Sequence, residues 1–224
     1  MMRRWISFSM LISVLFQGYC LAGEVEKTRS EKVRILVDVT EVPKLKEWAE
    51  KARVLCEKWY PIILDELKTE GVTPPKTVRL VFKKDMKGIA GTSGSTIEIS
   101  SAWVKENPDD FGMVIHELTH VVQGYPDYEP VWLIEGIADY VRFWKFEPKE
   151  KRPKIDPRTA DFRKGYQTAA AFLAWIVENQ DKKAILKLNK ALRKGHCKET
   201  IFKEIFGKEV DQLWKDFLAD QAKN

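Results

Sequence analysis

The chain has 224 residues, of which 44% are hydrophobic and 11% are aromatic. This length and composition support one sizeable packed domain and exclude a chain that is disordered throughout. The formal net charge is +5 with lysine and arginine spread along the chain, so an ordinary basic protein is expected, and no nucleic-acid-binding motif suggests a nucleic-acid partner.

The first 22 residues have the pattern of a secretory signal peptide. Arg3 and Arg4 precede an apolar run over residues 5–16, and small residues stand at the positions that a signal peptidase reads before Gly23. The apolar run is too short for a permanent membrane anchor. We therefore expect export, to the medium or the periplasm, of a mature domain over residues 23–224 that keeps no stable membrane anchor.

The three cysteines leave two questions open. Cys20 allows a lipoprotein signal as an alternative, although residues 17–19 before it match such a signal poorly. In an oxidising compartment Cys56 and Cys197 could pair. Two separate buried thiols are the alternative, and the sequence alone does not bring the two Cα atoms within bridging distance.

The front of the mature chain predicts a small sheet. Alternating apolar residues predict strands over residues 32–39, 78–82 and 96–100. A helix is expected from Pro43 to Leu67, with a kink or break at Pro61, because proline lacks the backbone donor. Three glycines at 88, 91 and 94 indicate a turning segment before the third strand.

From Asn107 onward the pattern is helical. Asn107-Pro108-Asp109-Asp110 is a strong helix start, and Gly124 and Pro126 predict the helix end after Gln123. Further helices are expected from Pro130 to before Pro148, over residues 166–177, and as shorter segments after residue 186, with a basic loop over 149–164. The fold class is therefore α+β, with a small N-terminal sheet and a mainly helical remainder.

Two of the three histidines stand in a His-Glu-x-x-His pattern, as His116 and His120. The four-residue spacing places both imidazoles on one helix face, where both can bind one metal ion. Glu117 lies about 100° around the helix from His116, where it can act as general base on a water at the metal. Two half-buried structural histidines are the alternative.

A catalytic zinc site usually has three protein ligands, and the next helix supplies acids. Residues 132–140 are almost entirely apolar, which implies burial, and Glu135 and Asp139 are exceptions one turn apart. Because a buried carboxylate needs a partner, Glu135 is expected as the third ligand and Asp139 as the acceptor for the free N–H of a ligating histidine. Ion pairs with Arg142 are the alternatives. Pro126 stands where a metzincin would need its third histidine.

The segments HELTH (116–120) and WLIEGIADY (132–140) resemble the gluzincin peptidases, most closely the basic secretory protein family of plants and bacteria. The likeness extends over roughly residues 33–220 and includes residues 92–94 and 166–173. It implies a zincin-like fold. It also implies one zinc ion held by His116, His120 and Glu135, a supporting acid at Asp139, and Tyr166 as a group that stabilises the tetrahedral intermediate. A tyrosine that closes a helix start is the alternative for Tyr166.

The resulting prediction is a secreted, monomeric, zinc-dependent peptidase acting on peptides or proteins, with Glu117 and Tyr166 as catalytic residues. Cleavage inside the chain is favoured, because the glycine-acid-asparagine motif of related aminopeptidases is absent. The strand over 96–100 is a candidate edge strand for an extended peptide, with an internal strand as the alternative. A secreted zinc protein that binds without cutting and a zinc hydrolase acting on a non-peptide bond are the alternative functions.

Overall fold

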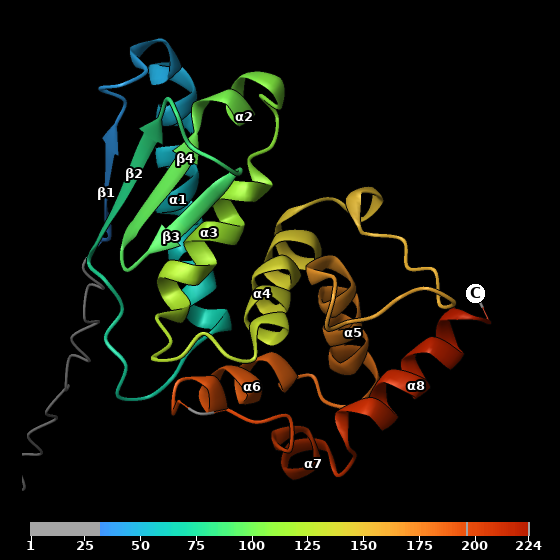
Figure 1. Ribbon diagram of the computed structural model, residues 1–224. Helices are drawn as coiled ribbons and strands as arrows, with labels where there is room; N and C mark the ends of the chain where they lie inside the picture. The colour runs from blue at the N-terminus through green and yellow to red at the C-terminus, as the bar shows by residue number, and fades with distance from the viewer. Residues whose placement is uncertain (1–31, 196, 224) are drawn as a thin grey trace, which may run out of the picture. The chain divides into compact units, whose positions relative to one another are not determined.

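The computed structural model of the chain describes residues 32–195 and 197–223, so the predicted leader lies outside the described residues. Within this part, four strands and eight α-helices form an α+β fold, which confirms the predicted class (Figure 1). The strands are β1 (Arg34–Asp38), β2 (Thr77–Lys83), β3 (Ala90–Ser93) and β4 (Thr96–Ser100). The helices are α1 (Lys46–Glu66), α2 (Ser101–Glu106), α3 (Gly112–Gln123), α4 (Val131–Tyr140), α5 (Tyr166–Asn179), α6 (Ala184–Leu192), α7 (Ile201–Phe206) and α8 (Val210–Gln221).

The sheet has the order β1-β2-β4-β3, in which β1, β2 and β4 are parallel and β3 is antiparallel to β4. The strand over 96–100 is therefore internal, and the expectation that it forms the edge is wrong. The edge strand next to β4 is β3, which lies inside the segment predicted to be turning. A two-residue turn at Gly94 and Ser95 joins β3 to β4, and Gly94 has φ of 56°, a conformation that glycine adopts without steric cost.

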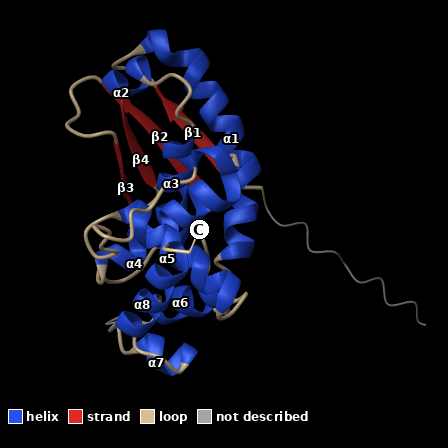
Figure 2. Ribbon diagram, turned by 90° about the vertical axis from the view of Figure 1, so that its right-hand side faces the viewer, coloured by secondary structure: helices blue, strands red, loops and turns tan. Residues whose placement is uncertain are grey.

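One face of the sheet is buried under helices. Val78, Leu80 and Phe82 of β2 and Ile97 and Ile99 of β4 are at most 1% exposed, because alternate residues point to the same face. Helices α1 and α3 lie along this face, and α4 to α8 lie beyond α3 (Figures 1 and 2). Helix α1 continues through Pro61, so the predicted break is not present.

The start of α3 differs from the prediction. A separate short helix, α2, follows β4 directly, and α3 begins at Gly112 rather than at Asn107. Asp110 still acts at this helix start, since its carboxylate accepts hydrogen bonds from the Met113 amide (3.2 Å) and from Trp103 Nε1 (3.0 Å). The predicted end is confirmed, with Gly124 in the left-handed conformation after Gln123.

Helix α4 continues as a π-helical turn over Val141–Phe146 and ends before Pro148, as predicted. It packs closely on α5, because a Cβ at Gly136 would lie 2.8 Å from the Cβ of Ala169. A glycine beside Glu135 therefore allows the close approach of α5.

The two described cysteines are separate thiols. Cys56 is fully buried in α1 and Cys197 is half-buried, and neither is in a disulfide. Burial raises the pKa of the Cys56 thiol to about 12. Over residues 32–195 and 197–223, no helix has both the length and the hydrophobicity needed to cross a bilayer.

Candidate metal centre

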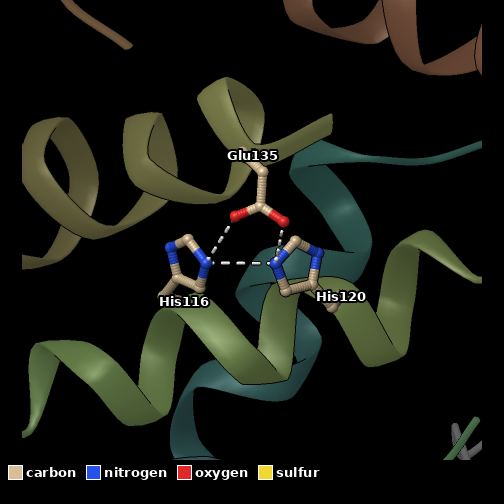
Figure 3. A group of neighbouring side chains, drawn as sticks. All are labelled: His116, His120 and Glu135. Atoms are coloured by element: carbon tan, nitrogen blue, oxygen red, sulfur yellow. Dashed lines mark hydrogen bonds and ion pairs between the residues drawn. The ribbon is translucent and has the colours of Figure 1, made fainter. Parts of the chain in front are cut away.

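Helices α3 and α4 bring His116, His120 and Glu135 together (Figure 3). One potential ligand atom from each residue lies within 4.8 Å of the others. Nε2 of His116 is 3.0 Å from Nε2 of His120 and 3.2 Å from Glu135 Oε2, and Nε2 of His120 is 3.6 Å from Glu135 Oε1. The three side chains therefore converge on one point between the two helices, as the spacing and the buried acid predict.

The other ring nitrogen of His116 faces Asp139. Its Nδ1 lies 2.7 Å from Asp139 Oδ1. An ionised carboxylate only accepts hydrogen bonds, so Nδ1 carries the proton of this contact and Nε2 is left to face the centre. The structure thus places Asp139 where a carboxylate orients a ligating histidine.

His120 is oriented by a residue that the sequence analysis did not single out, Gln123. The amide nitrogen of Gln123 donates to the Ile134 main-chain carbonyl (3.0 Å), which directs its Oε1 toward His120 Nδ1 (2.7 Å). The amide oxygen only accepts, so His120 Nδ1 is the donor and His120 Nε2 presents a lone pair to the centre. Gln123 also connects the end of α3 to α4, and the residue is 1% exposed.

The distances between the two imidazole nitrogens and from each of them to the nearer Glu135 carboxylate oxygen fit a zinc ion. Bonds of about 2.0–2.2 Å in a tetrahedral site place ligand atoms roughly 3.3 Å apart, and the observed 3.0, 3.2 and 3.6 Å lie around that value. The two imidazoles and the carboxylate are also the ligand types that zinc takes in catalytic sites. The residues present therefore fit this metal in both kind and spacing.

The charges around the centre favour a cation. Glu117, Glu135 and Asp139 are 7%, 7% and 6% exposed, and no lysine or arginine of the described residues forms an ion pair with any of them. Arg142 instead pairs with Asp110 (2.7 Å), so neither ion pair considered for it forms. Buried carboxylates without a counter-charge are costly, and a divalent ion would supply the missing charge.

The pKa values of His116 and Glu135 also indicate that the site favours positive charge. Burial of His116 opposes its protonation, but the carboxylates of Asp139 and Glu135 outweigh burial and raise the pKa of His116 to about 10. Burial would raise the pKa of Glu135, yet hydrogen bonds with His116 and His120 lower it to about 2. A metal ion bound there would compete with a proton for the imidazole, so metal binding is expected to release a proton.

Glu117 lies beside this centre and contacts the edge strand. The hydroxyl of Thr92 in β3 lies 2.7 Å from Glu117 Oε2 and 3.0 Å from the Glu117 main-chain oxygen. One hydroxyl proton donates to one of these acceptors at a time. Thr92 therefore links the proposed general base to β3, and this contact was not foreseen in the sequence.

A cavity of about 870 Å³ opens onto the centre. It is lined by β3, by α3 and α4, by the loop after α3, and by Tyr166 at the start of α5. Tyr166 is 48% exposed and lies on the cavity wall. A second tyrosine, Tyr128 in the loop after α3, donates its hydroxyl to Glu135 Oε1 and is also on this wall. Sequence reasoning missed Tyr128, because no periodicity marks a loop residue.

Replacing Gln123 by leucine should weaken zinc binding by about 10- to 100-fold, because His120 loses the acceptor that fixes its tautomer. Competition with a chromophoric chelator measures the affinity. Gln167→Leu is the matched control, since Gln167 lines the cavity without contacting His120. Equal zinc affinity in the Gln123 variant and the control would contradict the orienting role.

Comparison with known proteins assigns the chain to a family. A family model described as peptidase of plants and bacteria matches residues 47–217, which include every residue of the centre. No curated protein and no solved structure matches the chain. The match confirms the resemblance to the basic secretory proteins, and the chain belongs to this family of peptidases of plants and bacteria.

Proposed function

We propose that this protein is an exported zinc-dependent peptidase that hydrolyses peptide bonds within extended chains. The observation that carries the proposal is the convergence of His116, His120 and Glu135 beside the buried carboxylate of Glu117. Family membership gives the peptidase class, and the ligand spacing supports zinc as the metal. Every group that the site needs comes from one chain, which is compatible with a monomer.

Zinc, when bound, supplies a Lewis acid for the peptide carbonyl and lowers the pKa of a coordinated water to about 7. Glu117 accepts the proton of the attacking water and then transfers it to the nitrogen of the leaving amine. The Thr92 hydroxyl, 2.7 Å from Glu117 Oε2, holds the carboxylate in place. Asp139 and Gln123 keep both imidazoles in the tautomer that presents Nε2 to the centre.

The edge strand β3 is the proposed platform for the substrate. Its residues line the cavity, and Thr92 connects it to Glu117. An extended peptide can add to a free strand edge through main-chain hydrogen bonds. Antiparallel addition is the more stable arrangement per residue, so the peptide is expected to run opposite to β3.

Export is proposed from the leader pattern of residues 1–22 alone. The basic start, the short apolar run and the small residues before Gly23 are the supporting features. Secretion would place the peptidase among extracellular or periplasmic peptides and proteins.

Replacing Glu117 by glutamine should abolish cleavage of a mixed peptide library while leaving zinc content unchanged, because glutamine cannot accept the proton. A loss of at least about 100-fold in kcat is expected. Mass spectrometry of the digested library measures cleavage, and the wild-type protein with a chelator, then with zinc restored, is the parallel test of the metal. Cleavage that persists in Glu117→Gln would contradict the proposed role of Glu117. A wild-type protein that binds zinc but cleaves no peptide would instead favour the alternative function, a zinc protein that binds without cutting.

The two tyrosines on the cavity wall should behave differently. Tyr166→Phe is expected to lower kcat by about 10- to 100-fold with unchanged zinc affinity, because a donor to the developing oxyanion is lost. Tyr128→Phe is expected to weaken zinc binding by about 10-fold, because its hydroxyl contacts Glu135. Steady-state kinetics and zinc titration of both variants measure this. A full kcat in Tyr166→Phe together with a reduced kcat in zinc-saturated Tyr128→Phe would move the catalytic role to Tyr128.

A further inference from the structure

Arg142 is an arginine on the wall of the candidate metal cavity. It lies in the π-helical turn that continues α4, one turn beyond Asp139, whose carboxylate holds His116. Its Nη2 donates to Asp110 Oδ1 (2.7 Å), and its guanidinium lies 4.8 Å from the centre of the Phe143 ring. The side chain is therefore held firmly in place at the cavity.

The contacts of Arg142 show at which end of β3 it lies. Ala90 at the start of β3 pairs with Ile99, and α2 follows β4 directly. From α2, Trp103 Nε1 donates to Asp110, which in turn binds Arg142. Two residues after Ala90, Thr92 reaches Glu117. The strand β3 thus runs from the end that holds Arg142 toward the proposed general base.

The direction of β3 determines on which side of the cleaved bond Arg142 lies. A peptide that runs antiparallel to β3 passes the general base first and then reaches the Ala90 end. The residues that follow the cleaved bond therefore lie next to Arg142. This step rests on the peptide-binding part of the proposed function.

Nη1 is the terminal amino group of the guanidinium that keeps both of its N–H donors for a ligand. Nη2 is engaged by Asp110, and Nε is buried against Gly112, where a Cβ would lie 2.8 Å away. No hydrogen bond engages Nη1 within the described part of the chain, and the side chain is 22% exposed. Nη1 is thus the group that can bind a substrate.

The charge of Arg142 is already balanced by its neighbours. Asp110 pairs with it at 2.7 Å, Glu147 Oε1 lies 3.9 Å from its Nε, and Lys151 in turn pairs with Glu147 at 3.1 Å. The two positive and two negative groups of this cluster therefore balance one another. A neutral acceptor therefore fits better than an acidic side chain or a terminal carboxylate.

We propose that Arg142 binds the main-chain carbonyl of the substrate residue that directly follows the cleaved bond. Arg142 would then fix the register of the peptide through a main-chain contact that does not depend on the substrate's side chains. It would also favour substrates that continue beyond the cleaved bond as an uncharged main chain. Such a contact positions the scissile bond, for which small displacements are costly in rate.

The test compares a parent peptide with two uncharged analogues in which one peptide bond is replaced by a trans carbon–carbon double bond, which removes the carbonyl and keeps the planar shape. One analogue lacks the carbonyl of the residue after the cleaved bond, and the other lacks a carbonyl two residues before that bond. Binding is measured by calorimetry with zinc-loaded Glu117→Gln protein, with and without Arg142→Lys or Arg142→Met, so no cleavage is needed. Lysine keeps the charge for Asp110 but lacks the second donor of the guanidinium fork. Zinc content and thermal unfolding show that each variant is folded.

With Arg142 present, removal of the carbonyl after the cleaved bond should weaken binding by about 10- to 100-fold. In Arg142→Lys and Arg142→Met, the loss of affinity caused by removing this carbonyl should fall below about 3-fold. The loss of affinity for the other analogue should be the same with and without Arg142. A difference that persists in Arg142→Lys overturns the proposal, and so does an effect confined to the analogue on the N-terminal side. If wild-type protein cuts the parent peptide and Glu117→Gln still cuts it, the proposed role of Glu117 fails, whereas the assignment of Arg142 depends only on the carbonyl-dependent difference in binding.

Discussion

Three buried carboxylates on two facing helices set the conditions for the rest of this site. Glu117 comes from α3, Glu135 and Asp139 come from α4, and none is more than 7% exposed. Their negative potential raises the pKa of His116 despite its burial and makes the space between the helices a place for a cation. Metal binding and the docking of α3 on α4 are therefore expected to depend on each other.

The same docking positions the groups around the centre. The contacts between the helices pair Gln123 with Ile134, His116 with Asp139, and Asp110 with Arg142. Residue numbers fall along α3 as they rise along α4, so the helices are antiparallel. These contacts place both imidazoles and the Arg142 guanidinium on the wall of one cavity, while Thr92 connects β3 to α3. The proposed substrate platform, general base and metal ligands consequently share one framework.

Local signals explain how much of this could be predicted. The helix period places His116 and His120 on one face, and two acids in an apolar segment imply a buried polar site at Glu135 and Asp139. The fold class follows from strand patterns at the front and helical patterns after them. The contact of Gln123 with His120 could have been predicted, since Gln123 stands three residues after His120 on the same helix face. The two-residue Gly94-Ser95 turn was a weaker indication that β3 is a strand at the edge of the sheet.

Other features depend on tertiary contacts that no local pattern encodes. The path of the loop after α3 brings Tyr128 to Glu135, and strand order makes β4 internal. Arg142 is drawn away from Asp139, its neighbour one turn earlier, because Asp110 already lies at the start of α3 to receive it. Pro61 is accommodated within α1, since the packing of the helix on the sheet outweighs the loss of one backbone donor.

X-ray absorption at the zinc edge, together with the metal content of the purified mature protein, tests the central claim most directly. The account predicts one zinc ion per chain with two imidazole ligands and otherwise oxygen ligands, and loss of that ion in His116→Ala. A chain that retains no zinc above the level of His116→Ala would contradict the account, as would sulfur scattering from a cysteine ligand.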